Sequence, residues 1–229
     1  MPYVPSEKTD PPADDRRVLA PFIRNTAKFL AAEITTNGSL ITVYDRAFFK
    51  IADTIRRAHE GRGAKQYADL AQCLGKKIFE VGARYGYEGA FLGELNYAVT
   101  RLIQIVPQKK VDRGEWKESD ELRYWLYAST VEALMLAEKN TLSWKLGIGG
   151  VFADVKDEYK RRVNTAYEAA QIIKSGDCYD TPYYTRLIRV VDVNGTLVGH
   201  QEVMLKRSTE TLNVDVLDWE IVVRNTKKE

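Results

Sequence analysis

The chain has 229 residues, of which 45% are hydrophobic and 29% are charged. This is the composition of an ordinary globular protein, and the length suffices for one large domain, or a domain with an appendage, without disulfide or metal support. The 34 basic and 32 acidic side chains leave a formal net charge of +2. Dedicated nucleic-acid binders usually carry a strong basic excess, so the balance argues against that class.

Cysteine usage and the N-terminal residues indicate the compartment. Two cysteines, Cys73 and Cys178, are too few for a disulfide framework and fit a reducing environment. The start Met1-Pro2-Tyr3 lacks the basic residues and the apolar run of a signal peptide. No apolar stretch approaches the roughly 20 residues that span a bilayer. We therefore expect a cytoplasmic protein without membrane contact.

Apolar residues recur at helical spacing through the first three quarters of the chain and predict six helices. In the first helix Pro21 marks either the start of regular structure or a kink. We expect Pro107 to close the fourth helix and Ser119 to cap the fifth, with Trp125, Leu134 and Met135 on its apolar side. The predicted ranges are 16–35, 41–59, 64–84, 88–105, a segment after 119, and 151–174.

After Gly176 the apolar period changes to two, which predicts strands over residues 184–193, 196–205 and 212–223. Asn194-Gly195 is typical of a tight hairpin turn. The predicted fold is mainly α, with about six helices in a bundle-like body and a C-terminal three-stranded antiparallel β-meander. We expect three parts: an extended segment (1–15), a helical domain (16–178) and a β-rich extension (179–229). The extension should dock on the helices or on a second subunit, which favours a homo-oligomer.

Motifs for catalysis or metal binding are missing from the sequence. His59 and His200 have no partner at metal-ligand spacing, and no nucleophile motif is present. We therefore predict no cofactor, no metal and no catalytic residue. The segment 147–150 is glycine-rich and opens a helix, where backbone N–H groups could hold a phosphate. No strand precedes it and no Lys-Ser/Thr follows, so a turn with a helix cap is the favoured interpretation.

Two predicted helices carry tyrosine and arginine side chains that suit an anionic ligand. Tyrosine offers a stacking plane and arginine a bidentate fork for anions. On the fourth helix we expect Tyr97 and Arg101, with Glu94 beside them, to lie on the face opposite the buried one. In the alternative interpretation Tyr159 belongs to the core and Arg101 pairs with Glu94 or Glu158. The predicted ligand-binding residues are Asn96, Tyr97, Arg101, Tyr159, Arg162 and Tyr167.

The same segments resemble a family of small proteins from tailed-phage and prophage genomes. Its pattern begins Met-Pro-Tyr, continues with Asn-Tyr-x-x-Thr-Arg-Leu, and ends with a Tyr-x-Arg-Arg-Val helix followed by Gly-Asp-x-Tyr. The matching segments are 1–3, 96–102, 158–168 and 175–179. The chain departs from the pattern through a long helical segment before Asn96, Lys160 in place of a tyrosine, and the β-rich end. The resemblance implies phage origin and brings no known reaction.

These observations favour a non-enzymatic phage accessory protein in the cytoplasm of an infected bacterial cell. We expect it to bind a small anionic, nucleotide-like ligand or a host protein, for example in counter-defence by sequestration. The alternative is a structural or assembly protein of a phage particle that uses its C-terminal strands for subunit contacts. An enzyme ranks third, because catalytic sites can lack recognisable motifs.

Overall fold

The computed structural model describes residues 15–34, 40–165, 167–169, 183–191, 194, 196–206 and 220–222. The chain divides into two compact units, residues 1–165 and residues 166–229. Each unit is described by itself.

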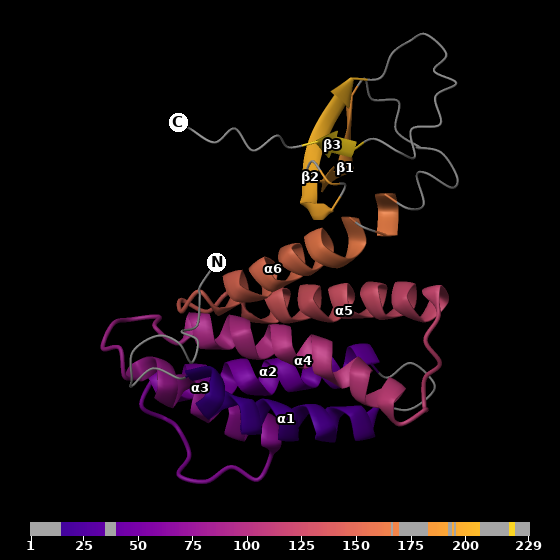
Figure 1. The fold of residues 1–229 in the computed structure, drawn as a ribbon. Coiled ribbons are helices and arrows are strands. Elements are labelled where there is room, and N and C mark those ends of the chain that lie inside the picture. The colour runs from indigo at the N-terminus through magenta and orange to yellow at the C-terminus, as the bar shows by residue number, and fades with distance from the viewer. Residues whose placement is uncertain are drawn as a thin grey trace. The chain divides into compact units, whose positions relative to one another are not determined.

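The first unit is α-helical, which confirms the predicted mainly helical body (Figure 1). Helix α2 packs against α3 and α5, α1 packs against α3 and α4, and α5 packs against α6. No helix in the described part of the chain is both long and apolar enough to cross a membrane. The helices are α1 (Asp15–Glu33), α2 (Leu40–His59), α3 (Leu70–Ala83), α4 (Leu92–Asp112), α5 (Asp120–Thr141) and α6 (Ile148–Tyr159), followed by the π-helix η1 (Lys160–Asn164).

Aromatic rings from α2 and α6 form the centre of the core. Tyr44 stacks on Phe48 with ring centroids 5.2 Å apart, and Phe48 meets Phe152 at 5.6 Å. All three side chains are fully buried. Leucine, isoleucine and valine side chains from α1, α3 and α4 pack around these rings, and α5 contributes Leu134. All six α-helices therefore share one apolar cluster.

Three predicted helix boundaries are wrong, each for a local reason. The third helix begins at Leu70 instead of 64, because the Asp69 carboxylate caps it by accepting hydrogen bonds from two backbone N–H groups. The fourth continues through Pro107 to Asp112, since its last turn buries Lys110 in an ion pair with Glu115. The sixth begins at Ile148 and changes to a π-helical turn after Tyr159. Pro21 lies inside α1, which begins at Asp15.

The buried face of α5 also differs from the expectation. Leu134 is buried as predicted, but the other buried side chains of α5 are small: Ser129, Thr130, Ala133, Ala137 and Thr141. Met135, predicted to face inward, is 52% exposed. Small residues let α5 approach α2 and α6 closely, so the helix packs without a wide stripe of large apolar side chains.

Helices α2 and α3 pack so closely that Gly75 has no room for a side chain. A Cβ atom added at this glycine would lie 2.6 Å from the Ile51 carbonyl oxygen. We expect Gly75→Ala to lower the free energy of unfolding by about 1–3 kcal/mol, because the helices must move apart. Urea unfolding followed by circular dichroism measures the change. Gly150→Ala is the matched control in a helix, since a Cβ there meets nothing within 4 Å; equal losses in both variants would contradict the prediction.

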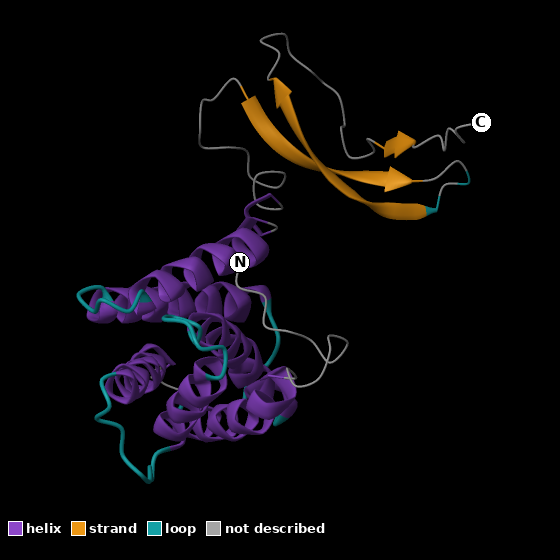
Figure 2. Cartoon of the chain, turned by 90° about the vertical axis from the view of Figure 1, so that its left-hand side faces the viewer, coloured by secondary structure: helices purple, strands orange, loops and turns teal. Residues whose placement is uncertain are grey.

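The second unit contains three strands among its described residues (Figure 2). Strands β1 (Tyr183–Val191) and β2 (Leu197–Lys206) pair antiparallel, whereas β3 (Glu220–Val222) lies parallel to β1. The strand order is β2-β1-β3. A meander requires the third strand to lie antiparallel beside the second, so the predicted three-stranded antiparallel β-meander is wrong. Gly195 of the expected turn and residues 212–219 of the expected third strand lie outside the described residues.

Candidate functional site

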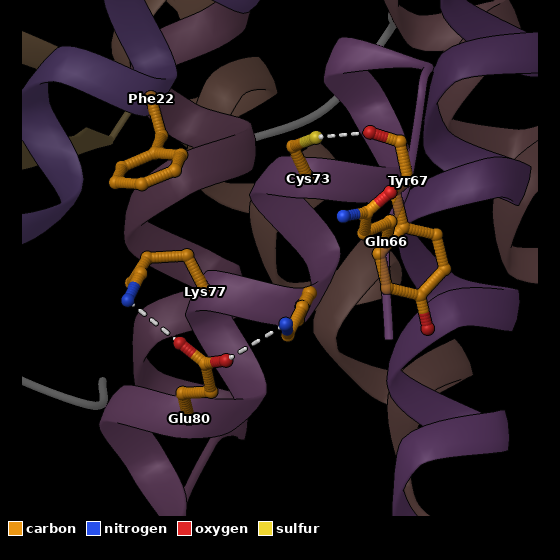
Figure 3. A pocket seen from close by; sticks show the side chains of 7 residues that line it. Phe22, Gln66, Tyr67, Cys73, Lys77 and Glu80 are labelled. Atoms are coloured by element: carbon orange, nitrogen blue, oxygen red, sulfur yellow. Dashed lines mark hydrogen bonds and ion pairs between the residues drawn. The ribbon is translucent and has the colours of Figure 1, made fainter. Parts of the chain in front are cut away.

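The first unit has a pocket of about 450 Å³ on the outer face of α3 (Figure 3). Four of its residues lie on α3 at positions 73, 76, 77 and 80, a spacing that places them on one face of a helix. Helix α1 contributes Phe22, and the segment before α3 contributes the other side. The lining residues are Phe22, Gln66, Tyr67, Cys73, Lys76, Lys77 and Glu80.

Hydrogen bonds hold the segment before α3 against the helix. The Cys73 thiol donates to the Tyr67 carbonyl oxygen at 3.3 Å, and the Tyr67 hydroxyl accepts from the Ala64 backbone N–H at 2.8 Å. The Asp69 carboxylate caps α3 and also accepts a hydrogen bond from Lys50 of α2 at 2.6 Å. These contacts fix the Tyr67 side of the pocket relative to α3.

The two lysines of the pocket converge on the Glu80 carboxylate; Lys77 and Glu80 are labelled in Figure 3. Lys77 Nζ lies 2.6 Å from Glu80 Oε2, and Lys76 Nζ lies 3.5 Å from Glu80 Oε1. The hydrogen bond from Lys77 lowers the pKa of Glu80, and partial desolvation opposes the shift. Lys77 Nζ also lies 5.5 Å from the centroid of the Phe22 ring, within the range of a cation–π contact.

This arrangement can attract an anion and stack a ring. Two ammonium groups against one carboxylate leave a local excess of positive charge, and a phosphate can accept hydrogen bonds from both lysines. Phe22 and Tyr67 supply aromatic surface and Gln66 an amide that both donates and accepts. The volume lies in the range of about 300–1,000 Å³ that is usual for small-molecule sites. Among the described residues, no group of three or more His, Cys, Asp or Glu side chains could hold a metal ion.

The residues predicted on the fourth helix lie elsewhere, on α4. The guanidinium of Arg16 from α1 lies over the Tyr97 ring, with 5.4 Å between the guanidinium carbon and the ring centroid. Arg101 Nη1 donates to Gln104 Oε1 at 2.8 Å within the helix, and Asn96 is half-buried. Glu94, expected on the polar face, is buried instead.

The residues predicted on the sixth helix have partners on α5 and on their own helix. Tyr159 packs against the core and stacks on Tyr127 of α5 with centroids 5.8 Å apart. Arg162 and Arg161 both donate to Glu158, and these hydrogen bonds lower the pKa of Glu158 to about 2. Tyr167 belongs to the second unit.

The predicted residues of α4 and those of the sixth helix each have contacts of their own. Arg101 pairs with Gln104, and Arg162 pairs with Glu158. The ion pairs that the alternative interpretation expected for Arg101 are therefore replaced by a neutral partner on the same helix. Ligand binding by these residues stays a prediction.

The glycine-rich segment forms a helix-capping turn. Gly147 precedes α6 with φ of 73°, a left-handed conformation that favours glycine. Gly149 packs against the backbone of Leu142, where an added Cβ would lie 3.0 Å from the Leu142 Cα atom. Turn geometry and close packing thus account for these glycines.

The sequence interpretation missed the pocket because its residues come from three separated segments. One signal was present: Lys76 and Lys77 precede Glu80 by four and three residues, which places all three on one helix face. Nothing local links that face to Phe22, which is more than 50 residues away in the chain.

Comparison with known proteins identifies a family for this chain but no individual relative. No curated protein and no solved structure matches the chain. One family matches residues 1–178, a span that contains all six α-helices and the pocket. Since the match covers more than half of the 229 residues, the chain belongs to the family described as a domain of unknown function (DUF6899).

Proposed function

We propose that the protein binds a small anionic ligand with a stackable ring, such as a nucleotide, in the α3 pocket. The observation that carries the proposal is the convergence of Lys76 and Lys77 beside Phe22 and Tyr67 in a hollow of about 450 Å³. An external phosphate would take the position of the Glu80 carboxylate between the two ammonium groups. The ring of the ligand would then lie against Phe22 or Tyr67.

The biological setting of this binding is proposed on the sequence resemblance. We place the protein in the cytoplasm of a phage-infected bacterium, where it sequesters a nucleotide-like signal without chemical turnover. The resemblance of segments 1–3, 96–102, 158–168 and 175–179 to tailed-phage and prophage proteins supports this setting. The ligand is proposed for the α3 pocket, so the α4 and α6 residues are not needed for it.

Isothermal titration calorimetry with adenosine and guanosine monophosphates tests the proposal. We expect Lys77→Gln to weaken binding about tenfold or more, because a charge-assisted hydrogen bond contributes about 1.5–3 kcal/mol. Lys76→Gln should have a smaller effect, since its ammonium group also contacts the Lys65 carbonyl oxygen at 3.4 Å. Phe22→Leu should weaken binding of the nucleotides and leave binding of inorganic phosphate unchanged.

Lys139→Gln is the matched control, because Lys139 is exposed on α5 and does not line the pocket. Native mass spectrometry of protein purified from expressing cells adds an unbiased readout, since it reports the mass of any retained small molecule. Equal affinities for wild type and for a Lys76→Gln/Lys77→Gln double variant would contradict the proposal.

A further inference from the structure

Ionisable side chains cluster where α1 begins, α3 ends and α4 begins, and the carboxyl groups of Asp15 and Glu94 are the buried members of this cluster. The Asp15 side chain, in the first turn of α1, is 0% exposed. Arg84, directly after α3, donates to Asp15 Oδ1 at 2.5 Å, and the hydroxyl of the next residue, Tyr85, donates to Asp15 Oδ2. Two charge-assisted hydrogen bonds thus tie the first turn of α1 to the segment that links α3 to α4.

Glu94 completes the cluster from the first turn of α4 and has no such partners. The residue is 3% exposed, and its Oε2 atom makes no hydrogen bond in the described part of the chain. An ionised carboxylate with a buried oxygen that lacks a hydrogen bond is unfavourable, whereas the protonated form is far less so. Burial, the largest cause, and the negative charge of Asp15 raise the pKa of Glu94 to about 7, whereas a hydrogen bond from its own backbone N–H and the positive charge of Arg84 oppose the shift.

The other charged group nearby is Arg16. Its guanidinium lies over the ring of Tyr97, one turn after Glu94 on α4, and its Nε atom is buried without a hydrogen-bond partner among the described residues. The charges that act on Glu94 are Asp15 of α1 and Arg84 at the end of α3. Protonation of Glu94 removes one of two neighbouring negative charges at the point where the three elements meet.

We propose that this cluster is a proton-sensitive latch: proton uptake by Glu94 holds the first turn of α1 against the α3–α4 corner, and ionisation of Glu94 loosens it. The inference goes beyond the proposed function and does not depend on ligand binding. Its basis is the juxtaposition of a fully buried Asp15, which carries both tying hydrogen bonds, with a buried carboxyl that has an unpaired oxygen.

The direction and range of the pH effect follow from the two states. In the loosened state Glu94 is solvated and ionises near its ordinary pKa of 4.5, whereas in the latched state its pKa is about 7. Between these values the loosened state loses its proton and the latched state keeps it. The latched-to-loosened ratio therefore falls by about tenfold per pH unit from pH 4.5 to 7 and levels off above pH 7.

Hydrogen exchange followed by mass spectrometry from pH 5 to 8 measures this ratio. The informative amides are those of residues 19–24, whose helical hydrogen bonds go to the first turns of α1. After correction for the intrinsic exchange rate, we expect the opening constant of these amides in the wild type to rise about fiftyfold or more over this range. Amides that exchange through openings in which Glu94 stays buried should show no such rise.

Glu94→Gln keeps the shape of the side chain and cannot ionise, so its opening constant should be independent of pH. Glu132→Gln is the matched control: Glu132 is an exposed carboxylate of α5 that does not line the pocket, and its substitution should leave the wild-type pH dependence intact. A wild-type opening constant that stays constant between pH 5 and 8 would overturn the proposal without any variant. The same pH dependence in Glu94→Gln and wild type would also overturn it.

Discussion

Asp15→Ala is expected to lower the free energy of unfolding of the helical unit by about 2–3 kcal/mol at pH 7. The substitution removes the acceptor of the Arg84 and Tyr85 hydrogen bonds and leaves a space at a fully buried position. The Arg84 side chain is 48% exposed and can return to water, which keeps the loss below that of a fully buried ion pair. Urea unfolding followed by circular dichroism at 222 nm, a helix-sensitive wavelength, gives the value.

A second measurement distinguishes the loss of the Asp15 hydrogen bonds from the loss of its side-chain volume. Burial and the hydrogen bond to Asp15 together raise the pKa of Tyr85 to about 12. In Asp15→Ala this pKa should fall towards its ordinary value of 10.0, which spectrophotometric titration of the tyrosines detects. Asp157→Ala is the control, since this aspartate lies on the exposed face of α6. Unfolding free energies equal to that of the wild type in both variants would show that the Asp15 contacts contribute nothing.

Helical periodicity accounts for most of what the sequence predicted correctly. Apolar spacing alone predicted the first helix over residues 16–35, and α1 spans Asp15–Glu33 with Leu19, Ile23 and Leu30 buried. Such predictions succeed because side-chain direction in a helix depends on position within the same short segment. They fail where the buried face consists of small residues, as on α5, because small side chains give a weak periodic signal.

The candidate sites were less predictable, because their residues meet only through tertiary packing. Asp15 lies 69 residues before its partner Arg84, and nothing in either local sequence points to the other. Glu94 was assigned to the polar face, next to Tyr97, yet it is buried in the first turn of α4. The predicted tyrosines of α4 and α6 instead make contacts within the helical unit: Tyr97 with Arg16, and Tyr159 with Tyr127.

The predicted strand order was wrong for a related reason. Alternation of apolar residues indicates extended segments, but it carries no information on which earlier strand a later one joins. In the second unit β3 lies beside β1 and parallel to it, although β2 is nearer in the chain. A parallel neighbour requires a crossover connection, and such a connection leaves no short-range turn signal like the Asn-Gly pair.

Phe48→Ala should give the largest loss of stability among these substitutions, about 3–5 kcal/mol. Phe48 is fully buried between Tyr44 and Phe152, with centroid distances of 5.2 and 5.6 Å, so truncation leaves a cavity and removes two aromatic contacts. Phe49→Ala is the control at the adjacent position, because Phe49 is 43% exposed and should cost about 1 kcal/mol or less. Urea unfolding of the two variants under identical conditions makes the comparison. Equal losses for the two phenylalanines would mean that α2 does not turn Phe48 towards the core and Phe49 towards solvent, as the packing indicates.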